Sequence, residues 1–205
     1  MTIANGTDSV ALSSVLQALV ASAAVGPAIR AHRWLPMPRL TVGLLMVLIA
    51  CFVAQALYPP LLALSERSPM VGHGQPWRLL TSQWFQDGGL AGTVLNLIML
   101  AAVGWVTEAK LSRRCWITAY VGGALTGGLA GLAWQPFGAG NSTAILGVAG
   151  ALFAATAFRG GSRRQRLYAA TPLLACLLMS GLHDIHGPAM ATGALIGTAC
   201  GGTTP

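Results

Sequence analysis

The chain carries a series of apolar stretches, each about sixteen to twenty residues long, separated by short polar or basic segments. About 20 apolar helical residues cross the roughly 30 Å hydrocarbon core of a bilayer. Of the 205 residues, 54% are hydrophobic and only 8% are charged, whereas soluble domains carry about 25% charged residues. The sequence therefore predicts an all-α, polytopic membrane protein without a separate soluble module.

We predict six transmembrane helices, over residues 40–57, 90–107, 115–134, 142–158, 167–182 and 185–200. They make up a six-helix membrane domain, 40–201, between a cytoplasmic N-terminal segment, 1–39, and a short tail, 202–205. Residues 9–29 are apolar, but Gln17 and several serines weaken insertion, so this stretch is either an interfacial helix or a weak extra span, and the interfacial helix is favoured. Trp77 and Trp84 place the non-spanning segment 58–88 at the membrane interface.

The basic residues indicate the orientation of these helices. With the N-terminus inside, ten of the twelve Lys and Arg residues fall on the inner side: Arg30, Arg33, Arg39, Lys110, Arg113, Arg114, Arg159, Arg163, Arg164 and Arg166. Cytoplasmic loops are enriched in Lys and Arg, so both termini are predicted to be cytoplasmic, in a multi-pass protein of the inner (plasma) membrane. The net charge of +7 is scattered between apolar runs, which argues against a nucleic-acid partner.

Two polar positions stand out at the ends of apolar runs. Ser142 follows the turn-rich residues 137–141, and His186 precedes a run of small residues. Polar side chains at membrane depth are costly and point to function, although a membrane serine often bonds to its own helix backbone and a histidine at a helix end is often interfacial. Both residues fall toward the outer side, so we interpret them as a candidate Ser/His dyad.

Small residues predict how the two helices meet. They recur at steps of three or four on each helix and form two ridges: Ala189, Gly193, Gly197 and Gly201, and Thr143, Gly147, Gly150, Ala151 and Ala154. Such ridges let helix backbones approach closely in a membrane. We therefore expect the two helices to pack against each other and bring Ser142 close to His186.

Neighbouring residues offer alternatives. His183 lies three residues from His186 and is a substitute candidate for the base. Asp184 lies two residues from His186, and on a continuous helix it would point elsewhere, so we do not predict it to be a third catalytic group. The four cysteines show neither a CxxC pair nor ligand spacing, so no disulfide framework, metal or cofactor is predicted.

Taken together, these residues resemble the rhomboid family of intramembrane serine proteases. The resemblance covers about residues 40–201 and rests on five motifs in order: Trp77-Arg78 in the loop, Asn96, Glu108 twelve residues later, Gly140 before Ser142, and His186 with Gly193. It implies that Ser142 attacks a peptide carbonyl and that His186 takes and returns the proton. Asn96 and the backbone N–H of Ser142 would stabilise the oxyanion, and single-span membrane proteins would be the substrates.

The chain also departs from the family pattern. Thr143 replaces the usual glycine after the serine, Leu146 replaces an aromatic residue, and Ala189 replaces a glycine. The histidines that usually precede the asparagine are absent: the positions counted from Asn96 and from Trp77 hold Gly92, Asp87, Gln86 and Ala91. Gln86 is the nearest alternative amide if its loop folds inward.

Each remaining motif residue has a simpler interpretation. Trp77 and Arg78 serve equally well as an interfacial anchor. Asn96 is suited to a helix–helix hydrogen bond. For Glu108 we favour an ion pair with Lys110 or Arg113.

The leading hypothesis is thus an intramembrane serine protease that uses a Ser142/His186 dyad. The alternative is a catalytically inactive rhomboid-like protein that binds transmembrane helices. A small transporter is disfavoured, because few ionisable residues lie in the apolar runs and no inverted repeat is visible.

Overall fold

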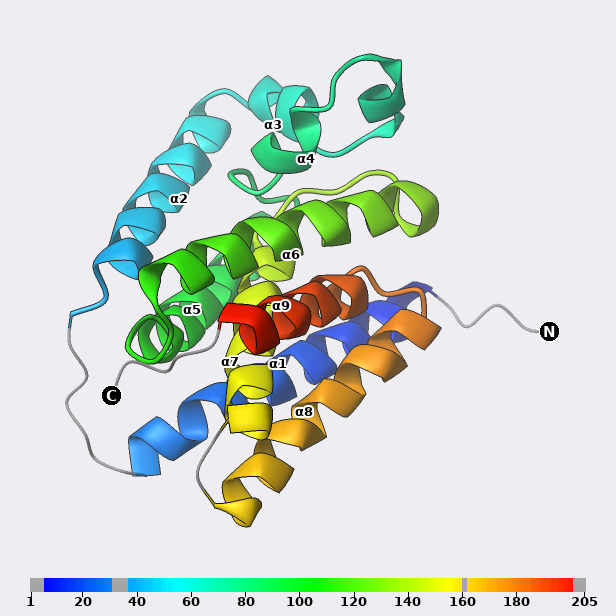
Figure 1. The fold of residues 1–205 in the computed structure, drawn as a ribbon. Coiled ribbons are helices and arrows are strands. Elements are labelled where there is room, and N and C mark those ends of the chain that lie inside the picture. Colours follow the sequence, from blue (N-terminus) through cyan, green and yellow to red (C-terminus); the bar gives the residue numbers. More distant parts are fainter. Residues whose placement is uncertain (1–5, 31–36, 160–161, 201–205) are drawn as a thin grey trace.

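In the computed structural model, residues 6–30, 37–159 and 162–200 are described, and they form helices and loops without a β-strand. The long helices are α1 (Gly6–Arg30), α2 (Arg39–Leu57), α5 (Gly89–Glu108), α6 (Arg113–Trp134), α7 (Ser142–Arg159), α8 (Arg163–Gly181) and α9 (His186–Cys200). Three short helices connect α2 to α5: α3 (Pro60–Ser65), the 3-10 helix η1 (Pro69–His73) and α4 (Arg78–Thr81). Figure 1 shows this connection as a compact cap over one end of the bundle.

The predicted fold class, an all-α polytopic membrane bundle, is confirmed. The six predicted spans correspond to α2 and to α5 through α9, with ends that differ by at most four residues. By length and mean hydropathy, α2, α5 and α6 qualify as membrane spans, and α7 is apolar but shorter. Arg33, Gly201 and the tail 202–205 lie outside the described residues.

The N-terminal segment differs from the favoured expectation. It forms the 25-residue helix α1, which packs against α5, α7 and α8 rather than lying apart from the bundle. Val20 and Ala24 are buried in the common core, and Figure 1 shows α1 running alongside α8. Gln17, which we expected to weaken insertion, donates to Ser13 at 2.9 Å and lies 3.4 Å from the Nδ1 of His186. Helix α1 is therefore packed against the bundle, while the domain boundary at residue 40 and the choice between an interfacial helix and an extra span stay predictions.

The centre of the bundle is α7, whose residues from Thr143 to Ala155 are buried. It packs along α9, as the two ridges of small residues predict. A Cβ at Gly193 would overlap the carbonyl oxygen of Gly147, and one at Gly197 would overlap that of Ala151. Because only glycine permits this approach, the first residues of α7 and α9 are held close together.

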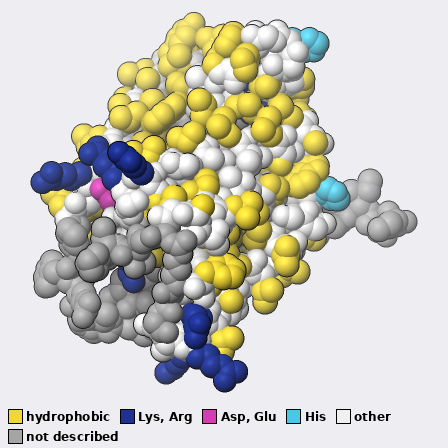
Figure 2. All heavy atoms as spheres, in the orientation of Figure 1, with side chains coloured by type: hydrophobic (Ala, Val, Ile, Leu, Met, Phe, Trp, Pro, Cys, Tyr) yellow, Lys and Arg dark blue, Asp and Glu magenta, His cyan; other side chains and the backbone are white. Residues whose placement is uncertain are grey.

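The exterior is apolar, as Figure 2 shows for one face. Large exposed side chains include Met46 and Val53 on α2, Leu90 and Ile98 on α5, and Leu174 and Leu177 on α8. A soluble monomer rarely exposes so much contiguous apolar surface. Apolar side chains on the exterior are suited to the hydrocarbon core of a bilayer. Lys and Arg side chains gather toward one end of this face (Figure 2). The orientation of that end, and with it the cytoplasmic location of both termini, stays a prediction.

Candidate active site

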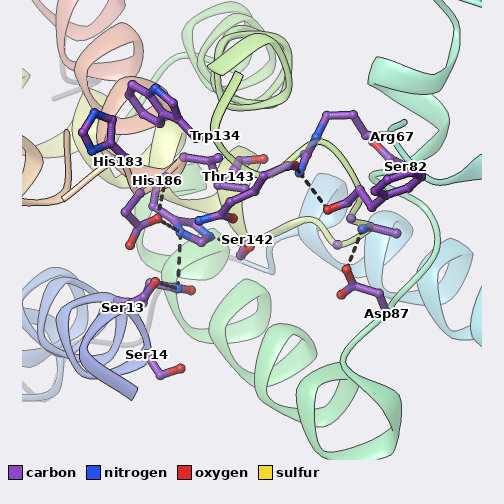
Figure 3. A pocket seen from close by; sticks show the side chains of 18 of the residues that line it. Ser13, Ser14, Arg67, Ser82, Asp87, Trp134, Ser142, Thr143, His183 and His186 are labelled. Atoms are coloured by element: carbon purple, nitrogen blue, oxygen red, sulfur yellow. Dashed lines mark hydrogen bonds and ion pairs between the residues drawn. The ribbon is translucent and has the colours of Figure 1, made fainter. Parts of the chain in front are cut away.

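A cavity of about 660 Å³ opens where several connections meet. Its walls come from the N-terminal half of α1, from Arg67, Ser82 and Asp87 in the segment between α2 and α5, from residues 134–143, and from residues 182–186. Figure 3 shows Ser142 and His186 in this cavity, with Ser13 of α1 on one side and Arg67 and Asp87 on the other. The cavity is large enough to hold a short stretch of peptide.

The predicted pair is brought together at its floor. Ser142 is the first residue of α7 and His186 the first residue of α9. The Ser142 Oγ lies 2.8 Å from the His186 Nε2, which is hydrogen-bond distance. His186 is only 8% exposed, so solvent competes little for its ring.

Asp184 corrects the sequence interpretation. We expected it to point away from His186 on a helix, but α9 begins only at His186 and residues 182–185 form a turn. The Asp184 Oδ1 lies 2.5 Å from the His186 Nδ1 and also accepts a hydrogen bond of 3.0 Å from the His186 backbone N–H. A carboxylate accepts only, so the Nδ1 carries the proton and the Nε2 is free to accept from Ser142.

This pairing also affects the carboxyl group. Burial acts to raise the pKa of Asp184, but the hydrogen bonds and the charge of His186, with a hydrogen bond from Ser13, outweigh burial and lower this pKa to about 2. Asp184 is therefore ionised throughout the range in which a peptidase works. The arrangement is a Ser–His–Asp row, not the isolated dyad that the sequence suggested.

His183 does not take the place of the base. It has a φ of 55° in the turn before α9, and its ring is nearly perpendicular to that of Trp134, with 5.2 Å between the ring centroids. Its side chain lines the same cavity. The hydrogen bond that Ser142 donates is accepted by the Nε2 of His186 and not by His183.

Helix α1 supplies two residues that the sequence analysis missed. The Gln17 Nε2 donates to the Ser13 Oγ at 2.9 Å and lies 3.4 Å from the His186 Nδ1. Ser13 also acts to lower the pKa of Asp184. Ser13 and Gln17 are four residues apart, on one helix face, in an apolar stretch, and that spacing is the signal that could have identified them.

The loop before Ser142 is fixed by its backbone. Gly138 forms an isolated antiparallel bridge with Arg67, through hydrogen bonds of 2.9 and 3.2 Å. The Ala139 N–H donates to the Asp87 carboxylate at 2.9 Å, and the Gly140 N–H donates to the Ser82 carbonyl at 2.8 Å. These bonds set the position at which the chain enters α7 and therefore the position of Ser142.

Arg67 carries the positive charge of this wall. Its side chain is 4% exposed, and its Nη2 donates to the Gln135 carbonyl at 2.7 Å. Burial lowers the pKa of the guanidinium, while Asp87 and Glu66 act in the opposite direction. The group contacts Gly131, where a Cβ would overlap it, so it braces the loop against α6.

Asn96 lies behind the loop rather than on the cavity wall. Its Nδ2 donates to the Gln86 Oε1 at 2.7 Å, and the Gln86 Nε2 donates to the Asn141 Oδ1 at 3.3 Å. The loop that carries Gln86 does fold inward, since Gln86 is 2% exposed and pairs with Gln55 of α2 through two hydrogen bonds. Gly140, with a φ of 149°, passes directly over this amide network, and a Cβ there would crowd the Asn96 amide. An oxyanion role for Asn96 stays a prediction.

The other motif residues hold the scaffold. Arg78 is buried and donates to the Ala63 and Glu66 carbonyls at 2.9 and 3.0 Å, while its neighbour Trp77 is 54% exposed. Arg78 therefore organises the connection between α2 and α5, and Trp77 is free to contact the membrane interface. Gly147 and Gly193 make the contact between α7 and α9.

Our prediction that Glu108 forms an ion pair with Lys110 or Arg113 is wrong. Its carboxylate accepts hydrogen bonds from the backbone N–H groups of Leu40 and Thr41, at 2.8 and 2.9 Å, and from the Thr41 Oγ1 at 2.9 Å. Glu108 thus caps the N-terminus of α2, where unpaired N–H groups favour a negative charge.

Comparison with known proteins adds one finding. The family model described as the Rhomboid domain matches residues 73–204, which include Asn96, Ser142, Asp184 and His186 and leave out α1 and α2. None of the curated proteins compared with the chain matches it. Within the part of the chain that the structure describes, no three His, Cys, Asp or Glu side chains gather as a metal site would require.

Proposed function

Because the chain belongs to the rhomboid family and is a membrane protein, we propose that it is an intramembrane serine protease. One observation carries the proposal: Ser142, His186 and Asp184 lie in a row at the floor of a cavity, joined by hydrogen bonds of 2.8 and 2.5 Å. A serine hydroxyl is a weak nucleophile by itself and needs an adjacent base, which in turn needs a fixed orientation. The three groups meet both needs.

The reaction follows from the proton positions. The Ser142 Oγ forms a bond to the peptide carbonyl carbon while its proton moves to the His186 Nε2. The resulting imidazolium is held by Asp184 through the Nδ1 proton. When the tetrahedral intermediate collapses, the C–N bond breaks and the Nε2 proton goes to the leaving amine. Water then hydrolyses the acyl-enzyme through the same base, and Ser142 recovers its proton.

The oxyanion needs preorganised donors. The backbone N–H of Ser142 lies in the first turn of α7, where N–H groups have no carbonyl partner within the helix. Asn96 and Gln86 lie behind Gly140 and are the nearest side-chain amides. We propose that the Ser142 N–H and the Asn96 amide share this role.

We propose single-span membrane proteins, cut near their outer end, as the substrates. Over their described residues, α7 and α9 rise about 27 and 22 Å, against a hydrocarbon core of about 30 Å. We propose that their first residues lie below the outer surface and that water reaches them through the cavity. We place the chain in the inner membrane with both termini cytoplasmic; a cysteine at Ser162 that reacts with an impermeant reagent from outside would overturn this orientation.

One observation favours a second candidate. The positions at which the family has its loop and helix histidines hold Gln86, Asp87, Ala91 and Gly92, so fewer side-chain donors surround the oxyanion. A protein that lost catalysis could still bind transmembrane helices. The catalytic row is the feature that such a protein would not need to keep, and its presence favours the protease.

Labelling with a fluorophosphonate separates the two candidates. We expect the purified protein to be labelled and to cleave a single-span substrate, and we expect Ser142→Ala and His186→Ala each to abolish both activities. Ser142→Ala should change thermal stability little, whereas His186→Ala should also lower it, because the buried Asp184 loses its partner. Ser180→Ala is the matched control, because its hydroxyl donates to its own helix at Cys176. Absence of labelling in the folded wild-type protein would favour the inactive, helix-binding protein.

A further inference from the structure

The N-terminal helix contacts the catalytic row although it lies outside the residues that the family model matches. It packs against α5, α7 and α8, and this places its polar pair, Ser13 and Gln17, beside the turn that carries Asp184. Figure 3 shows Ser13 on the α1 side of the cavity that holds His186. A polar pair in an apolar helix is costly unless it has partners, and here the partners are the catalytic groups.

The contacts of this pair point to the catalytic row. The Gln17 Nε2 donates to the Ser13 Oγ at 2.9 Å and lies 3.4 Å from the His186 Nδ1. Ser13 lines the same cavity as Asp184, and its hydroxyl is one of the groups that act to lower the pKa of that carboxyl. The Asp184 carboxylate can only accept, and it accepts from His186, whose Nε2 faces Ser142.

We propose that the Ser13 hydroxyl donates to Asp184, and that Ser13 and Gln17 are positioning residues that hold Asp184 in the orientation that keeps the proton on the Nδ1 of His186. This inference rests on the proposed protease function for its kinetic consequence. The active site is then complete only when α1 is seated against α5, α7 and α8. The N-terminal helix becomes a required part of the enzyme and not a membrane anchor for it.

The pair is not a general packing feature of α1. The helix contributes Val20 and Ala24 to the common core, while Val15 is 55% exposed on its outer face. Ser13 and Gln17 lie between these surfaces, are partly buried and line the cavity. Replacing Ser13 with alanine removes one hydroxyl and leaves the packing residues in place.

Full-length Ser13→Ala protein tests the proposal, with Ser13→Thr as the variant that keeps the hydroxyl and Val15→Ala as the control on the same helix. A hydrogen bond to a charged group is expected to be worth roughly ten- to a hundredfold in rate. We expect kcat to fall by about that factor in Ser13→Ala with KM little changed, Ser13→Thr to recover most of the loss, and Val15→Ala to match the wild type. Gln17→Leu should show a smaller loss of the same kind.

Nuclear magnetic resonance of protein with ¹⁵N-labelled histidine gives a readout that does not need turnover. The hydrogen-bonded Nδ1 proton of His186, assigned by its absence in His186→Gln, should shift and exchange faster with water in Ser13→Ala, and should be unchanged in Val15→Ala. An identical resonance and identical kcat in Ser13→Ala and wild type would overturn the inference. If no variant cleaves any substrate but the resonance still depends on Ser13, the positioning stands and the protease function fails.

Discussion

The Nδ1 atom of His186 lies 2.5 Å from the Oδ1 atom of Asp184, a carboxylate only two residues earlier in the chain. This proximity is possible because the turn at residues 182–185 ends where α9 begins. The same carboxylate accepts the backbone N–H of His186, so one group fixes both the start of the helix and the orientation of its first side chain. The base, His186, and the carboxylate that orients it, Asp184, therefore belong to one local structure.

Replacing Asp184 with asparagine should separate these two roles. The amide oxygen can still accept from the His186 backbone, so the turn should persist, but the imidazolium loses its negative partner. We expect kcat to fall by about a hundredfold or more with KM little changed, and thermal stability at neutral pH to fall as well, because the stabilising carboxylate charge is gone. Steady-state kinetics on a fluorescent membrane substrate measure this loss. Undiminished kcat in Asp184→Asn would show that Ser142 and His186 act without a third group.

Acid should destabilise the protein through the same residue. The pKa of Asp184, usually 3.8, is lowered to about 2 in the folded protein, so its contribution to stability is complete above about pH 4 and is lost as the pH falls toward 2. Thermal unfolding in detergent between pH 5 and pH 2 should show this decline in the wild type. In Asp184→Asn the decline should be shallower, and curves of equal slope would contradict the assignment.

Particular residues show how far sequence reasoning reaches. The ends of α2 and of α5 to α9 follow from where apolar runs meet polar segments, and the approach of Gly193 to Gly147 follows from small residues at helical spacing. Asp184 was missed because a helical direction was assumed for a residue that lies in a turn. Glu108 was assigned to nearby cations because its partners, Leu40 and Thr41, are distant in sequence.

The packing of α1 was not predicted, for a different reason. Its serines and Gln17 lower its hydropathy, and hydropathy measures transfer into lipid. It does not register a polar side chain whose partner is supplied by another part of the protein, which here is the turn at Asp184 and His186. The packing of α1 against the bundle therefore could not be predicted from the hydropathy of that helix alone.

Gly193→Ala should disrupt the contact on which the site depends. A methyl group at this position would overlap the Gly147 carbonyl oxygen, so α9 must move away from α7, at a cost of about 1–3 kcal/mol or more. We expect a lower unfolding temperature together with loss of cleavage. Gly43→Ala in α2, where nothing lies within 4 Å of an added Cβ, should be neutral or slightly stabilising. Equal effects of the two changes would remove the argument for close packing.

Glu108→Ala should destabilise α2 by about 1–2 kcal/mol, because three donors at the start of that helix lose their acceptor. Lys110→Ala tests the ion pair that the sequence suggested. Lys110 is exposed, and its loss should change the free energy of unfolding by less than about 0.5 kcal/mol. Unfolding followed by circular dichroism compares the two variants. A larger loss in Lys110→Ala would restore the ion pair.

The amide network behind Gly140 tests how the oxyanion is stabilised. In the resting site the Asn96 amide donates to Gln86, and its second hydrogen is the one available to a substrate oxyanion. If Asn96 has that role, Asn96→Ala should lower kcat by a hundred- to a thousandfold, since a preorganised donor is worth roughly 3 kcal/mol. If Asn96 serves only in packing, Asn96→Ala should leave kcat per folded molecule unchanged and should lower only the unfolding temperature. Rates must therefore be normalised to folded protein.

Gly92→His adds the donor that the family pattern has and this chain lacks. An added Cβ at Gly92 meets nothing within 4 Å, so the side chain has room. With the same register from Asn96, we expect the variant to raise kcat while leaving KM nearly constant, because the new donor acts on charge that develops only in the transition state. Gly92→Leu is the control of similar size without a donor. No gain in Gly92→His, combined with a harmless Asn96→Ala, would leave the backbone N–H of Ser142 as the main oxyanion donor and would favour the inactive, helix-binding protein.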